Sequence, residues 1–88
     1  RKIMKNYIFA KDILEEKHVG SLVHVKEVFH STTGKVICRE YDNCIITNFY
    51  KGFMLKCCIF LSNCENLIYD LDSEHIHLYI AFPEEHDE

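Results

Sequence analysis

FMLKCCIFL, at residues 53–61, is the one long apolar run in the chain, and Lys56 is its only charge. Nine residues are too few to cross a bilayer as a helix, which takes about 20. Because no polar face interrupts the run, it predicts a central strand that is buried on both faces. We expect the shorter segments around it to pair with it as antiparallel strands.

The other segments alternate apolar and polar residues and are separated by turn residues, as short strands are. We expect strands over residues 21–30, 35–40, 44–50, 67–71 and 75–82. Turns are expected at 31–34, 42–43 and 72–74, with a turn or a sharp kink at 51–52. A change of parity between Val25 and Val28 indicates a bulge or bend in the first strand.

One helix is expected before these strands. Asn6 is a suitable N-cap for a helix over residues 7–18, and Gly20 can supply the left-handed residue that ends it. Helical spacing would place four residues on one apolar stripe: Phe9, Ala10, Ile13 and Leu14.

These elements predict a mostly β, α+β fold with one N-terminal helix, arranged as a small antiparallel β-barrel. Both an SH3-like (Sm or Tudor type) and an OB-like barrel fit, and a helix cradled by an antiparallel meander is the alternative. A helix, then Val23-x-Val25 and five strands, resembles an Sm-type module at the level of the fold alone, since the glycine and the Asp–Met-Asn spacing that identify that family are absent. We expect residues 1–83 to form a single domain and residues 84–88 an acidic mobile tail.

The net charge of −4 comes from the end of the chain, because four of the 14 acidic residues lie in residues 84–88. The rest of the chain has ten acidic residues and ten lysines and arginines. A neutral body lacks the basic excess of non-specific DNA-binding proteins. The chain opens on Arg1 rather than Met, and we expect a piece of a longer protein without a secretory signal.

The five cysteines are Cys38, Cys44, Cys57, Cys58 and Cys64. An odd number, with two adjacent residues on opposite faces of a strand, does not suit a disulfide framework, so we expect reduced thiols in an intracellular (nuclear or cytoplasmic) protein. Cys64 with His75 or His77 could be drawn as a nucleophile and base, and Cys57 or Cys58 could join them around zinc. Because neither arrangement has its usual local signature, we expect no enzyme, no metal and no cofactor.

Two groups of residues are candidate binding sites. His75, His77 and Tyr79 alternate with a buried face on a strand that we expect at a sheet edge, where a partner chain could pair. An aromatic and basic set is expected near one end of the strands, where it could stack single-stranded RNA or DNA or cage a methylated lysine or arginine. Its members are Arg39, Tyr41, Phe49, Tyr50, Lys51 and Phe53.

The function expected from these features is a non-enzymatic protein-interaction module of a larger intracellular protein. It would assemble a complex by strand or surface pairing with another protein chain or with a second copy of itself. The alternative is a small barrel that binds single-stranded nucleic acid, or a methyl-lysine or methyl-arginine reader. We expect no membrane partner.

Overall fold

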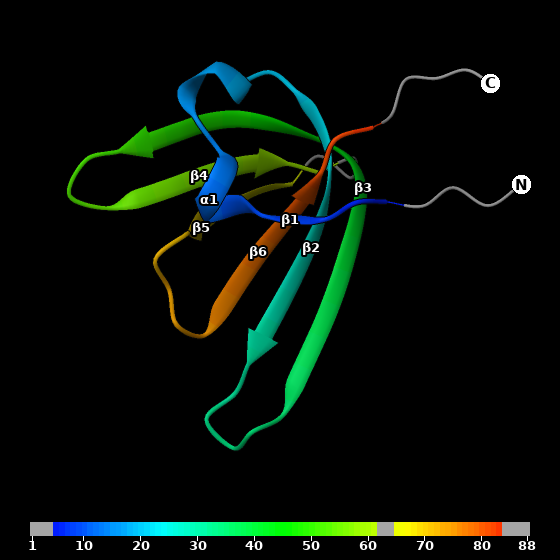
Figure 1. Cartoon of the computed structure of the whole chain (residues 1–88), viewed down its shortest axis with the longest axis vertical. Helices are drawn as coiled ribbons and strands as arrows, with labels where there is room; N and C mark the ends of the chain where they lie inside the picture. The colour runs from blue at the N-terminus through cyan, green and yellow to red at the C-terminus, as the bar shows by residue number, and fades with distance from the viewer. Residues whose placement is uncertain (1–4, 62–64, 84–88) are drawn as a thin grey trace, which may run out of the picture.

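A computed structural model of the chain, which describes residues 5–61 and 65–83, contains one six-stranded antiparallel sheet (Figure 1). The strands are β1 (Ile8–Phe9), β2 (Leu22–His30), β3 (Val36–Lys51), β4 (Leu55–Phe60), β5 (Asn66–Asp70) and β6 (Ile76–Ala81). The helical elements are the single turn α1 (Ala10–Ile13) and the 3-10 helix η1 (Glu16–His18). The predicted mostly β architecture with one small helix is therefore confirmed.

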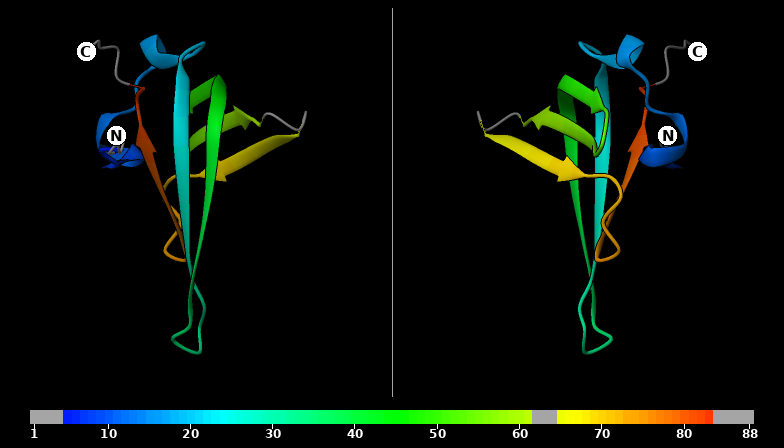
Figure 2. Two further views of the ribbon diagram at one scale, coloured as in Figure 1. Left: turned by 90° about the vertical axis from the view of Figure 1, so that its right-hand side faces the viewer. Right: turned by 90° about the vertical axis from the view of Figure 1, so that its left-hand side faces the viewer.

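The strand order is β1-β6-β2-β3-β4-β5, so β2 to β5 follow one another and β6 returns to pair with β2. The sheet is strongly curled, and β4 and β5 turn away from the plane of β2 and β3 (Figure 2). It is not closed, because in the described ranges β5 pairs with β4 and not with β6. The predicted barrel is therefore not confirmed.

The helix predicted over residues 7–18 is wrong in extent. Ile8 and Phe9 are extended and pair with Ile80 and Tyr79, so Phe9, not Asn6, precedes the helical turn. Leu14 leaves the helical region after one turn, with φ −70° and ψ 137°. Pairing with β6 thus overrides local helical propensity. Three residues of the predicted stripe nevertheless reach the core, since Ala10 and Leu14 are buried and Ile13 packs against them, whereas Phe9 packs beside Tyr79.

The first hairpin forms where it was predicted. Gly34 has a φ of 93°, and its N–H donates to the Ser31 carbonyl at 3.1 Å. The hairpin of β2 and β3 extends beyond the end of β6 (Figure 1). The irregularity in β2 lies between Val23 and Val25, earlier than the one predicted between Val25 and Val28.

The turn predicted at Asp42-Asn43 is wrong, because β3 runs through it as one strand of 16 residues. Asn43 takes a positive φ of 59° inside the strand, and its N–H donates to His24 Nδ1 at 3.5 Å. The residues there form a bulge, which bends a strand without ending it. The bend passes β3 from β2, its first partner, to β4, its second.

The run at residues 53–61 is buried on one face only, so the prediction of a strand buried on both faces is wrong. Cys57 and Ile59 are fully buried, while Cys58 and Phe60 on the opposite face are half-buried. Phe53 is fully exposed in the turn that joins β3 to β4. β4 lies next to the edge strand β5, and in the described ranges no second layer covers its other face.

The core lies on one face of the curled sheet, which we term the inner face; the opposite one is the outer face. Strand register places alternate residues of every long strand there, as Val25 opposite Ile80 and Ile46 opposite Ile59 illustrate. The alternation predicted for the last strand is confirmed, since Leu78 and Ile80 are buried. The buried cluster comprises Ala10, Leu14, Val23, Val25, Cys44, Ile46, Phe49, Cys57, Ile59, Leu61, Tyr69, Leu71, Leu78 and Ile80.

Candidate functional site

One half of β3 has a free edge. β3 pairs with β2 from Val36 to Ile45 and with β4 only from Ile45 onward. In the described part of the chain, the edge of β3 that faces away from β2 has no strand beside it over residues 36–42. We term these residues the open edge.

The direction of the backbone groups on the open edge follows from the hairpin. The Ser31 N–H donates to the Lys35 carbonyl at 2.9 Å, whereas the His30 N–H turns the other way and donates to the His75 carbonyl at 2.7 Å. Because this direction alternates along an antiparallel ladder, Ile37 and Arg39 bond to β2. The residues whose N–H and C=O groups face away from β2 are Val36, Cys38 and Glu40.

Apolar side chains accompany these free backbone groups. Val36 is 53% exposed, Ile37 is 41% exposed, and Phe29, opposite Ile37 on β2, is 37% exposed. Natural sheets commonly protect their edges with proline, lysine or a cover of other chain. The open edge, VICREYD, contains neither proline nor lysine but carries the charged residues Arg39, Glu40 and Asp42, and its outward-facing backbone groups remain able to pair with another strand.

A cavity of about 300 Å³ lies on the inner face beside the open edge. It exists because the inner face of the hairpin continues past the core, where β4 and β5 do not reach over it. Its walls are Glu27 and Phe29 of β2, Ile37 and Arg39 of β3, and Ile76 of β6. The cavity therefore combines an apolar floor with one acid and one base.

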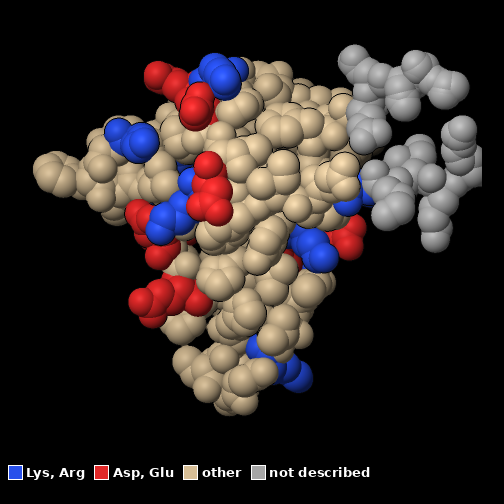
Figure 3. Space-filling model, viewed as in Figure 1, with Lys and Arg blue, Asp and Glu red and all other residues tan. Residues whose placement is uncertain are grey.

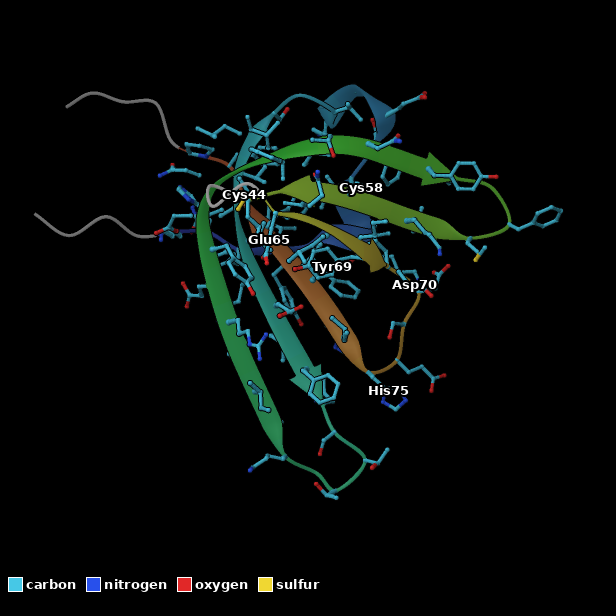
Figure 4. All side chains as sticks on the ribbon, turned by 180° about the vertical axis from the view of Figure 1, so that it is seen from behind. Cys44, Cys58, Glu65, Tyr69, Asp70 and His75 are labelled. Carbon is cyan, nitrogen blue, oxygen red and sulfur yellow. The ribbon has the colours of Figure 1, made fainter. Side chains whose placement is uncertain are left out.

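Tyr69 lies at the boundary between this region and the core. Figure 4 shows its side chain pointing from β5 into the interior of the curled sheet. Its hydroxyl is buried and makes no hydrogen bond of good geometry among the described residues, although the Glu27 carboxylate lies close enough to act as an acceptor. Burial raises the pKa of Tyr69 well above its ordinary value, and the nearby charge of Glu27 raises it further.

The outer face of the hairpin is crossed by the N-terminal segment. Lys5 Nζ bonds to Asp42 Oδ1 at 2.6 Å, and the Tyr7 hydroxyl donates to Glu40 Oε1 at 3.2 Å. The ammonium of Lys26 lies 5.5 Å from the centre of the Tyr7 ring. The hydrogen bond with Lys5 lowers the pKa of Asp42, and the same bond raises the pKa of Lys5. These contacts leave the inner face of the hairpin uncovered.

The strip predicted from His75, His77 and Tyr79 is only partly available to a partner. β6 lies between β1 and β2, but β1 pairs only with Tyr79 and Ile80, so within the described residues the predicted edge position holds only for the first half of the strand, Ile76 to Leu78. Phe9 of β1 packs on this strand, with its ring centre 5.7 Å from that of His77 and 5.4 Å from that of Tyr79. His75 lies in the turn before β6, exposed and apart from Tyr69 (Figure 4).

The predicted aromatic and basic set is not one cluster. Arg39 and Tyr41 lie on the inner face of the first half of β3, Phe49 is buried in the core, and Tyr50 and Lys51 lie at the far end of the strand. Phe53 is in the next turn. About 12 residues of extended strand, roughly 40 Å along the chain, separate Arg39 from Lys51. These residues therefore do not lie together at one end of the strands, as the prediction had placed them.

The cysteines show no reactive arrangement within the described residues. Cys57 is buried on the inner face and Cys58 half-buried on the outer face, as their adjacency predicted, and burial raises the pKa of Cys57 to about 12. Cys44 is buried, but Cys38 is exposed on the open edge. No group of three or more potential metal ligands is found among described residues. Cys64, which both the nucleophile and the zinc arrangement would need, lies outside them.

A second free edge runs along β5. The Leu71 N–H donates to the Leu55 carbonyl and the Leu61 N–H to the Glu65 carbonyl, so the alternation turns the backbone groups of Asn66 and Ile68 away from β4. Ile68 is 67% exposed. This edge is shorter than that of β3, since β5 has only five residues.

Val36, Ile37 and Phe29 were not among the residues singled out from the sequence. In the sequence, these residues are marked only by an apolar pair on each side of the turn at 31–34, and ordinary strand propensity explains such pairs equally well.

On the face shown in Figure 3, acidic and basic side chains are interspersed. No helix in the described ranges is both long and apolar enough to span a membrane. Neither a family of proteins, nor a curated protein, nor a solved structure matches this chain.

Proposed function

We propose that this domain is a protein-interaction module that binds an extended segment of a partner protein along the open edge of β3. The partner segment would add a strand to the sheet, a recognised mode of peptide binding. The observation that carries the proposal is the row of outward-facing backbone groups on Val36, Cys38 and Glu40.

Two further features support this edge over the edge of β5. A strand added to β3 would lie beside a cavity that can take its side chains. Backbone pairing supplies affinity, and such a cavity supplies the specificity that backbone pairing lacks. The exposed Val36 and Ile37 would also be covered by the added strand, which removes apolar surface from water.

We also propose that the connectivity is SH3-like rather than OB-like. An OB fold is a Greek-key barrel. Here β2 to β5 form a meander and β6 pairs with β2, the first long strand, which supports an opened SH3-like arrangement over a Greek key.

The test uses a displayed library of linear peptides selected against the immobilised domain. Selected peptides should shift the NMR amide signals of Val36, Cys38 and Glu40. Cys38→Pro removes an edge N–H that β2 does not use, so it should weaken binding at least about tenfold, the effect of one or two lost backbone hydrogen bonds. Cys38→Thr keeps the N–H and should bind as the parent does.

Ile68→Pro is the matched control, because it blocks the edge of β5 in the same way. A library without binders, or binders sensitive to Ile68→Pro and not to Cys38→Pro, would overturn the proposal. Light scattering of the free domain identifies self-association through the same edge. Titration of single-stranded RNA with salt tests the alternative function, since phosphate contacts give a steep salt dependence.

A further inference from the structure

We propose that the bound segment carries an acidic side chain two residues from an apolar one, and that Arg39 and the cavity beside it select this pair. This inference rests on the proposed strand pairing at the open edge and concerns what the partner must look like. Nothing in the backbone contacts alone would require such a pair.

The spacing follows from strand geometry. A strand added beside β3 places every second side chain on the inner face, directly beside Ile37 and Arg39. These two positions are two residues apart in the added strand also. An antiparallel partner would therefore present the acid first and the apolar residue second, and a parallel partner the reverse.

The apolar position is set by the cavity. Phe29, Ile37 and Ile76 contribute its apolar walls, and Phe29 and Ile37 remain more than a third exposed in the free domain. A branched aliphatic or aromatic side chain beside Ile37 would lie over these walls. The cavity of about 300 Å³ has room for one such side chain.

The acidic position is set by Arg39. Its guanidinium forms no ion pair within the described ranges, although Glu27 is its cross-strand neighbour. Glu27 is half-buried, on the side of the cavity towards Tyr69. A side chain on the added strand would be about 4.8 Å across the sheet from Arg39 but about twice as far from Glu27. Attraction to Arg39 therefore exceeds repulsion by Glu27, and an acid is favoured over a lysine.

Two synthetic peptides of about nine residues test the inference. Apart from the central residue, both consist of threonine and valine, with one valine two residues before the centre and one two residues after it, so that either strand direction fits. The central residue is glutamate in one and lysine in the other. The parent domain should prefer the glutamate peptide by about threefold to tenfold, the size expected when an exposed ion pair replaces a like-charge contact.

Arg39→Glu should reverse this preference, and Arg39→Gln should abolish it. The second variant keeps the test decisive if a glutamate facing Glu27 prevents folding. Lys51→Gln, at the far end of β3, is the matched control and should keep the preference of the parent. Peptides that lose affinity in Cys38→Pro but show no preference would overturn this inference and leave the proposed function standing. Peptides that do not respond to Cys38→Pro would overturn the proposed function itself.

Discussion

Proline substitutions at two neighbouring residues of β3 should have very different costs. Arg39 donates its N–H to β2, whereas the N–H of Cys38 faces the open edge. Arg39→Pro deletes a ladder hydrogen bond worth about 1 kcal/mol and leaves a strand carbonyl without its donor, a further cost of about 1–3 kcal/mol. Cys38→Pro deletes no ladder bond, so its cost should stay within about 1 kcal/mol.

The difference, about 2–3 kcal/mol, is large against the stability of about 4–13 kcal/mol expected for a chain of this length. Urea unfolding followed by circular dichroism measures it, with each proline compared to alanine at the same position so that the loss of the original side chain cancels. Equal costs at the two positions, or a larger cost at Cys38, would refute the assignment of the open edge.

Ile59→Ala should lower the free energy of unfolding by about 2–5 kcal/mol, because the side chain is fully buried; a thermal midpoint within a degree or two of the parent would contradict the core assignment. Tyr69→Phe should raise stability by about 1 kcal/mol, since it removes a buried hydroxyl that makes no hydrogen bond of good geometry; a lower midpoint would mean that the hydroxyl is bonded to Glu27. The pKa of Asp42 is lowered in the folded state, so its pairing with Lys5 stabilises the fold above the ordinary value of 3.8 and is lost as pH falls through the folded-state pKa. The NMR shifts of Lys5 in the parent should change as the pH falls through that acidic range. At about pH 7, the Lys5 shifts of Asp42→Asn should already differ from those of the parent; Lys5 shifts that respond neither to acid nor to this substitution would exclude the contact. Phe53→Ser should leave unfolding unchanged within about 0.5 kcal/mol, since the ring is fully exposed; a larger loss would show that the ring packs.

Local patterns predicted the parts of this fold that local forces decide. The turn at 31–34 depends on Gly34 and its immediate neighbours, and it forms as expected. The alternation of residues 75–82 reports a sheet with one buried face, which β6 has. Positive φ at Asn43 serves a bulge as readily as a turn, so the residue type alone could not separate the two.

Contacts between distant residues decided the rest. Residues 8 and 9 are extended because β6, some 70 residues later, offers them a ladder. An apolar run shows that a strand can be buried, but a second layer must exist to bury its other face, and β4 has none in the described ranges. The open edge is similarly invisible in sequence, because it arises where β3 bends and β4 begins too late to cover its first half.

Amide hydrogen exchange along β3 tests the central claim most directly, because it reports which N–H groups are bonded. In the free domain, the amides of Ile37 and Arg39 should exchange slowly. The amides of Cys38, which lies between them, and of Glu40, which follows Arg39, should exchange at rates close to those of an unprotected chain. Equal protection at all four amides would show that the edge is already covered, and would contradict both the open edge and the strand pairing proposed for it.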